Sequence, residues 1–159
     1  MAGKARRPLD YSTKVPVHQT VAECSAALAA AGASAVTTEY DHGEPCGLGF
    51  MLETPHGKRR FAMPVRVDGV AAMIERMMRE NPPDVSGPKG RLLTREHAAA
   101  VAWRQVLHWL RAQLAIIEAG MAGLDEVMLA WLQIEADGRE LTLYEHYKNQ
   151  ESAALEAGR

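Results

Sequence analysis

The longest helical pattern of the chain extends from Thr94 to Leu132. In its first part the apolar residues recur at spacings of three and four, with a narrow polar stripe between them. Gly120 interrupts the pattern, and a short second helix is expected from Leu124 to Leu132. A helix that is apolar around most of its circumference is buried on most of it, so we expect a central helix lying across a sheet. The polar stripe consists of His97, Arg104, His108, Arg111 and Glu118.

Alternating apolar and small or polar residues predict a β-meander ahead of this helix. The alternation is clearest at 48–52, which has the period of a strand with one apolar face. A β-prone segment precedes it at 35–40, and a second alternating segment follows it at 59–65. The segments 41–43 and 54–57 between them have the composition of turns. Three consecutive strands joined by short turns predict an antiparallel meander.

Shorter elements are expected on either side of the meander. The alternation at 11–15 predicts a short strand. Thr20 and Glu23 have the spacing of a capping box, which predicts a helix from Thr20 to Ala31. Asp68 is expected to cap a further helix that carries several methionines.

Together these elements predict one α+β domain at 10–150, with a small antiparallel β-meander packed against a long central helix and two to three shorter helices. The segment 139–150 fits either a strand or a last helix, and its pattern does not decide. We expect the following division of the chain: a disordered basic arm at 1–9, a β-rich half at 10–80, a linker rich in Pro and Gly at 81–93, a helical half at 94–150, and a frayed tail at 151–159.

Length and composition fit this single domain. The chain has 159 residues, of which 47% are apolar and 24% charged. These are ordinary values for a globular protein. The net charge of −2 argues against a protein that coats nucleic acid by charge alone. The charge is nevertheless uneven, with eight Lys/Arg against six Asp/Glu up to Arg66 and ten against fourteen after it.

The cysteine content and the hydropathy indicate a cytoplasmic protein. Cys24 and Cys46 lie far apart, and free thiols are favoured over a disulfide. A zinc site needs about four ligands at short spacings, so neither a metal nor another cofactor is expected. The chain has no run of about 18 apolar residues and no apolar leader. We therefore expect no membrane association and a cytoplasmic location.

Three segments carry a resemblance to known proteins: TPHGKRRFAMPVRVD at 54–68, the helical stretch at 94–129, and GRELTLYE at 138–145. Through them the chain resembles a group of small uncharacterised proteins encoded by tailed bacteriophages and prophages. The resemblance extends from Tyr11 to about Tyr147. It implies a location in the cytoplasm of a bacterial host cell and a mobile-element context, such as replication, recombination, counter-defence or host takeover. It carries no catalytic or binding residues over to this chain.

Basic residues form the first set of candidate functional side chains. A hairpin tip with three consecutive basic residues can clamp a nucleic-acid backbone, although such residues also keep an edge strand soluble. Arginines on the polar stripe could bind phosphates, although a buried helix must expose some polar residues, and that account is favoured. We hypothesise a non-enzymatic DNA-binding accessory protein of phage or prophage type. Its candidate contacts are Lys58, Arg59, Arg60, Arg66, Lys14, Arg104 and Arg111.

The alternative hypothesis is a protein-interaction module without nucleic-acid binding, either a homo-oligomer or an inhibitor of a host factor. Trp131, Met77 and Met78 are its candidate interface residues, although core filling is the favoured role of the methionines. A small hydrolase with His56 or His146 as base is a third possibility. Neither histidine has a nucleophile in a recognisable motif, so we expect no catalytic residues and no enzyme.

Overall fold

The structure is a computed structural model that describes residues 7–82 and 89–157. It confirms the α+β class. The elements in chain order are α1 (Val17–Ala30), β1 (Ala35–Asp41), β2 (Glu44–Thr54), β3 (Gly57–Pro64), α2 (Val67–Glu80), the 3₁₀ helix η1 (Lys89–Leu93), α3 (Arg95–Glu118), α4 (Leu124–Met128), the 3₁₀ helix η2 (Leu129–Trp131), β4 (Gln133–Ala136), β5 (Arg139–Thr142) and α5 (Leu143–Ala157).

The predicted meander is present as an antiparallel sheet in the order β1-β2-β3. His42 and Gly43 form the loop between β1 and β2, and both have positive φ, 48° and 81°. This is the backbone conformation of the two-residue hairpin turn that matches strand twist. The turn between β2 and β3 is closed by Thr54, whose hydroxyl donates to the Gly57 carbonyl at 2.7 Å and accepts from the His56 amide at 3.1 Å. Both turn predictions are confirmed.

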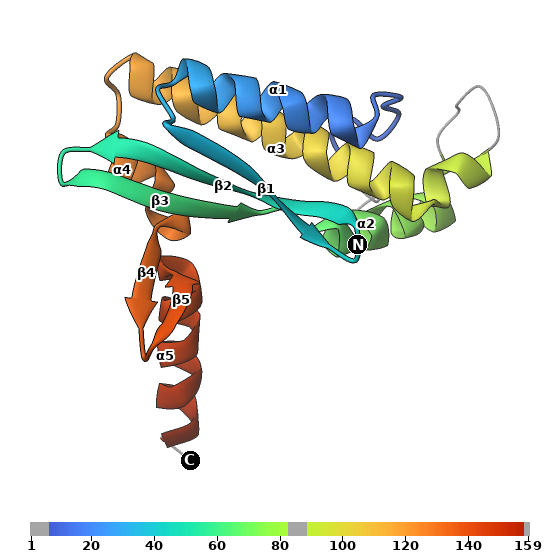
Figure 1. Cartoon of the computed structure of the whole chain (residues 1–159). Coiled ribbons are helices and arrows are strands. Elements are labelled where there is room, and N and C mark those ends of the chain that lie inside the picture. Colours follow the sequence, from blue (N-terminus) through green and yellow to red (C-terminus); the bar gives the residue numbers. More distant parts are fainter. Residues whose placement is uncertain (1–6, 83–88, 158–159) are drawn as a thin grey trace.

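The core lies between one face of this sheet and the helices. Figure 1 shows α1 and α3 side by side along the sheet, and α2 also packs against α3. Phe50 of β2 and Phe61 of β3 are paired in register and stack at 5.5 Å between ring centroids. Trp103 and Leu107 of α3 are fully buried with them. The Trp103 indole donates to a carbonyl of β2 at 3.2 Å, so the expectation of a central helix across a sheet is confirmed.

The strand predicted at 11–15 is wrong. Residues 9–12 form turns, and Asp10 has φ 58°. A strand needs a neighbouring strand for its backbone groups, and here side chains of α3 take that place. His97 binds the Tyr11 carbonyl at 2.6 Å, and Gln105 donates to the Leu9 carbonyl at 3.0 Å.

Both predicted helix caps are also wrong. Helix α1 begins three residues earlier than expected, at Val17 after Pro16, and Thr20 lies within it and is fully buried. Helix α2 begins at Val67, so Asp68 lies in its first turn and pairs with Arg95 instead of capping. In each case the polar residue that suggested a cap lies inside the helix.

The predicted segments at the boundaries need correction as well. Residues 83–88 of the predicted linker lie outside the described residues, but 89–93 form η1, whose Leu92 belongs to the core. Residues 1–6 of the predicted basic arm also lie outside them, and Pro8 is already buried. The segment 139–150, which fitted either a strand or a helix, contains both, because β5 is followed directly by α5. Helix α5 continues to Ala157, so a frayed tail from residue 151 is wrong up to that residue.

Residues 133–157 form a C-terminal arm, and the described residues before them form the body of the molecule. The arm consists of the β4–β5 hairpin and α5, and Figure 1 shows it extending away from the body. It is joined to the body by the hydrogen bond from the Leu143 amide to the Leu132 carbonyl, at 2.9 Å, and by the contact of the Arg66 guanidinium with the Tyr144 ring. Along its described length α5 has no buried residue. None of the described helices is both long and apolar enough to cross a membrane.

Candidate interaction surfaces

The tip of the β2–β3 hairpin carries the basic residues Lys58, Arg59 and Arg60, and all three are exposed. The register places Lys58 directly across from Glu53, while Arg59 lies across from Leu52 at the edge of the buried face. Among the described residues none of the three basic side chains takes part in an ion pair. The tip therefore presents cationic groups on both faces of the strand, with one carboxylate opposite.

The other predicted basic contacts do not join this tip. Arg66 follows the far end of β3, where its guanidinium lies over the Tyr144 ring at 5.7 Å from the centroid. Eight residues of nearly extended chain separate it from Lys58, a distance of roughly 26 Å. Lys14 lines a cavity between the beginnings of α1 and α3. The structure thus distributes these residues over three places.

The polar stripe of α3 is an internal ionic seam. Glu23 of α1 accepts from Arg104 at 3.0 Å through one carboxylate oxygen and from Arg111 at 3.1 Å through the other. The Arg104 side chain is only 17% exposed. His108 of the same stripe lies 3.1 Å from the Asp10 carboxylate. Both arginines are thus already paired with Glu23, so this seam joins α1 to α3, although the Arg111 side chain remains 51% exposed.

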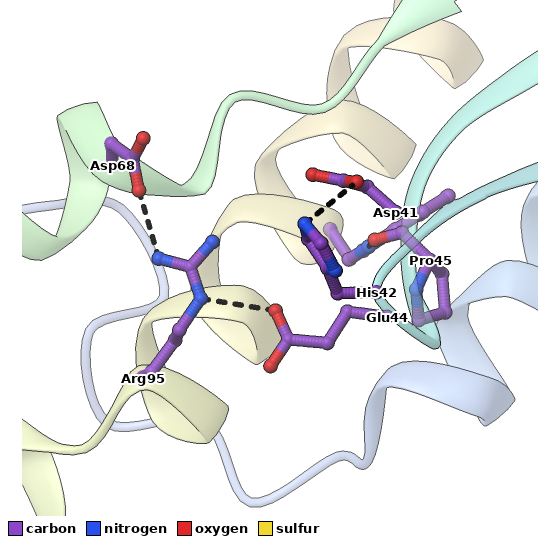
Figure 2. Close-up of polar contacts among 7 residues, drawn as sticks. Asp41, His42, Glu44, Pro45, Asp68 and Arg95 are labelled. Atoms are coloured by element: carbon purple, nitrogen blue, oxygen red, sulfur yellow. Dashed lines mark hydrogen bonds and ion pairs between the residues drawn. The ribbon is translucent and has the colours of Figure 1, made fainter.

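A second ionic contact joins three elements at the β1–β2 turn, and Figure 2 shows it in close-up. Arg95, the first residue of α3, donates to Glu44 at 3.0 Å and to Asp68 at 2.8 Å. The hydrogen bonds to Asp68 and Glu44 raise the pKa of Arg95 further above its usual range. All three side chains are exposed, so water screens the attraction and the contact orients more than it stabilises.

An aromatic groove lies where α3 meets η2. Trp109 and Trp131 pack edge to face with 6.5 Å between ring centroids, and Trp109 remains 36% exposed. They border a groove of about 390 Å³ that is lined mostly by apolar side chains. We call it the tryptophan groove and define it by Met63, Arg66, Val70, Val106, Trp109 and Trp131.

The predicted interface residues Trp131, Met77 and Met78 differ in how far they are buried. Trp131 is partly buried against the core and lines the tryptophan groove, as expected for a residue with one free face. Met77 is fully buried, so its role as an interface residue is wrong in this conformation. It completes the core beneath α2, and Met78 is partly buried beside that core. Burial could have been anticipated for Met77, because it continues the apolar stripe of its helix.

The two cysteines are free, as predicted. Burial raises the pKa of the Cys24 thiol to about 11, so this thiol stays protonated and unreactive at neutral pH. The described residues contain no group of three or more His, Cys, Asp or Glu side chains arranged to hold a metal ion. His56 lies 3.9 Å from Asp125, and both groups are exposed to solvent.

Comparison with known protein families, curated proteins and solved structures gives no match for this chain. The resemblance to phage and prophage proteins therefore stays a prediction.

Proposed function

We propose that the protein is a non-enzymatic interaction module that self-associates, with α5 of one copy docking in the tryptophan groove of another. The observation that carries this proposal is the exposure of α5. The helix has 15 residues, none of them buried. Its Tyr147 is 58% exposed and its Leu155 72% exposed. The proposal develops the interaction-module hypothesis and replaces Met77 with the arm as the contacting element.

The exposed apolar face of α5 is expected to need a partner. Isolated helices shorter than about 12–15 residues are only marginally stable in water, and helices in proteins gain most of their stability from an apolar face that packs. Tyr144, Tyr147 and Leu155 lie within a sector of about 80° at 100° per residue. They form an apolar stripe along α5, in which the Tyr144 ring lies against Arg66 while Tyr147 and Leu155 are more than half exposed. We therefore infer that another chain covers it.

The tryptophan groove offers a complementary surface. Its lining is mostly apolar, and Arg66 is the one charged residue among the described residues of that lining. Helix α5 carries Glu145, Glu151 and Glu156 against a single Lys148. An acidic helix with an apolar stripe fits an apolar groove that has a cationic edge, which is a recurring mode of helix recognition.

A second copy is the occupant that these features favour. Groove and helix belong to the same chain, but the arm extends away from the body, as Figure 1 shows. A two-fold pair can satisfy both surfaces at once, because each copy offers a groove and receives a helix. Trp109 and Trp131 would be the anchor residues, since buried tryptophans dominate the energetics of interfaces.

The test is the molar mass in solution, measured by light scattering over a wide range of protein concentration. The wild type is expected to be a dimer or higher oligomer, and the double variant Tyr147→Glu/Leu155→Glu a monomer. Tyr40→Glu is the matched control, because Tyr40 is 64% exposed but lies on β1. A monomeric wild type at all concentrations would refute the proposal, and so would an equal loss of association in the control.

DNA binding through the hairpin tip is the second candidate. The specific observation in its favour is that Lys58, Arg59 and Arg60 are exposed and unpaired among the described residues. Exposed and unpaired cations are what phosphate contacts require, and the expected mobile-element context agrees with such a role. Glu53 across from Lys58 and the net acidity of the chain weaken this candidate relative to the first.

Fluorescence anisotropy with labelled single- and double-stranded oligonucleotides tests this candidate. Binding through the tip should weaken steeply as the salt concentration increases. Arg59→Ala/Arg60→Ala should lower the affinity and make the slope of log affinity against log salt concentration less steep, by the amount expected for the loss of about two phosphate contacts. Arg76→Ala on α2 removes an exposed charge elsewhere and serves as control. Unchanged binding in the double variant would exclude the tip, and no binding at low salt would exclude the candidate.

A further inference from the structure

A second hollow lies beside the tryptophan groove, between the body and the C-terminal arm. Its volume is about 270 Å³, and residues of β1, β2, β3 and the arm line it. Trp131 and Arg66 line both this hollow and the tryptophan groove, so the two adjoin. Among the described residues of its lining are three carboxylates, those of Glu39, Glu140 and Glu145. We call it the acidic hollow.

The carboxylates of the acidic hollow have no cation paired with them in a single copy. Glu39 and Glu140 take part in no ion pair among the described residues. Glu145 is held within the arm, where one of its oxygens accepts from the Thr142 amide at 2.7 Å. Arg66 is the one basic residue among the described lining, and its guanidinium lies over an aromatic ring of α5. Carboxylates around one hollow repel each other, and a cation placed among them relieves this repulsion.

A buried oxygen in the same lining also lacks a donor. Gln133 of β4 lines the acidic hollow, and its Oε1 atom is buried without a hydrogen-bond partner among the described residues. An amide oxygen can only accept, and leaving it unpaired costs free energy. An ammonium group has three N–H donors, enough for this oxygen and two carboxylates. The acidic hollow is therefore suited to the end of a lysine side chain.

Helix α5 carries its one lysine on the side of the apolar stripe. At 100° per residue, Lys148 lies about 40° from Tyr144 and about 20° from Leu155 around the helix. Lys148 is exposed and takes part in no ion pair among the described residues. A copy that docks this stripe in the tryptophan groove of another copy therefore brings Lys148 to the same surface.

An acidic residue lies next to this lysine on the docking side. Glu151 is about 20° from Tyr144 around the helix and one turn beyond Lys148. It is exposed and unpaired among the described residues. Arg66 of the groove also makes no ion pair among them. The docking side of α5 thus carries a cation and an anion one turn apart, and the receiving surface carries an acidic hollow next to an arginine.

We propose that these charges fix the register of the docked helix: Lys148 of one copy enters the acidic hollow of the other, and Glu151 pairs with Arg66. The inference rests on the self-association proposed above and names the residues that make it specific. The hydrophobic effect is not directional, so apolar contacts alone let a helix shift along a groove. Complementary charges across an interface fix the register and disfavour mismatched partners.

Charge reversal tests this proposal, with the dissociation constant of the full-length dimer measured by analytical ultracentrifugation. Lys148→Glu brings a like charge to the acidic hollow and should raise the dissociation constant by about tenfold or more. Glu39→Lys/Glu140→Lys should also raise it, because Lys148 then meets cations. The three changes together restore opposite charges and should return the constant to within about threefold of the wild-type value.

The contact between Glu151 and Arg66 is tested in the same way. Glu151→Arg and Arg66→Glu should each raise the dissociation constant, and the two together should lower it again. A double variant that associates no better than either single variant would remove this contact from the proposal.

Lys58→Glu is the matched control, because Lys58 is an exposed lysine on the hairpin tip without an ion pair among the described residues. It should leave the dissociation constant unchanged, and it should not rescue Glu39→Lys/Glu140→Lys. Circular dichroism checks that each variant is folded. If Glu39→Lys prevents folding, Glu140→Lys with Lys148→Glu provides the same test.

Failure of this inference is distinguishable from failure of the proposed function. If the wild type associates and Lys148→Glu associates equally well, self-association stands and the charge-fixed register is wrong. The same holds if the combined variant remains as weak as Lys148→Glu, or if Lys58→Glu rescues equally well. A wild type that is monomeric at all concentrations overturns both.

Discussion

The body of the molecule and its C-terminal arm differ in how they bury apolar side chains. In the body, α3 places Trp103, Leu107 and Leu110 out of solvent against the strands, and a continuous core results. In the arm, α5 is of similar length to α1 but has no buried residue. It contacts η2, β4 and β5, while Tyr147 and Leu155 remain largely exposed. A helix with an exposed apolar face is the element through which this chain is expected to meet another.

The largest expected effect comes from a cavity in the core of the body. Leu107→Ala should lower the free energy of unfolding by about 2–5 kcal/mol, because the buried methyl groups are lost and the neighbours cannot fully close the gap. Leu155→Ala in the arm, measured in the background of Tyr147→Glu to weaken self-association, should change it by less than about 0.5 kcal/mol. Urea unfolding followed by circular dichroism measures both. Similar losses at the two sites would mean that the arm packs as the body does.

The ionic seam between α1 and α3 should have the next largest effect. Glu23→Gln leaves Arg104 and Arg111 without their shared carboxylate. Arg104 is mostly buried, so we expect the free energy of unfolding to fall by about 1–2 kcal/mol. A fully buried ion pair would lose more, but Glu23 and Arg111 are partly exposed to water. Glu75→Gln on the exposed side of α2 is the control and should be nearly neutral. A neutral Glu23→Gln would show that apolar packing alone holds α1 in place.

The contact between α3 and the N-terminal segment makes the stability of the body depend on pH. Burial lowers the pKa of His97 in the folded state below its unfolded value of 6.5. Between these two pKa values the unfolded chain binds the extra proton, so the free energy of unfolding falls as the pH drops below about 6.5. Thermal midpoints across this range should fall in the wild type and fall less in His97→Gln. An identical pH profile for the two proteins would contradict the buried, neutral state of His97.

The smallest effect is expected at the contact in Figure 2. Arg95, Glu44 and Asp68 are exposed, so Arg95→Gln should leave the thermal midpoint of the protein nearly unchanged. A large fall in the midpoint would show that this contact, and not the apolar core, fixes the β1–β2 turn against α2 and α3.

The regular part of the fold follows from local pattern. The alternation of Leu48, Phe50 and Leu52 marks the buried face of β2, and the apolar positions of α3 mark a central helix. These features were predictable because each depends on residues that are close in sequence. The turns at 41–43 and 54–57 were predictable for the same reason.

The wrong predictions concern segments whose structure depends on residues that are far away in the sequence. Residues 11–15 have the alternation of a strand, but α3 supplies side-chain partners for the backbone there, and His97 lies 86 positions away from Tyr11. Arg104 and Arg111 have the spacing of an open basic stripe, but Glu23, more than 80 residues away in the sequence, pairs with both of them. The cavity at the start of α1 and α3 was not predicted, because separate segments of the chain form it. The sequence showed only two neighbouring features of it, namely Lys14 and the absence of acidic residues in the first turn of the helix after Pro16.

Hydrogen exchange measured by mass spectrometry on α5 tests the central claim most directly. If a second copy covers the arm, the amides of 146–157 are protected at high protein concentration and lose this protection on dilution, while those of α3 stay protected throughout. In Tyr147→Glu/Leu155→Glu they should exchange rapidly at every concentration. Protection of α5 that is equal at all concentrations, or its absence in the concentrated wild type, would contradict the account of the arm as the element that binds another copy.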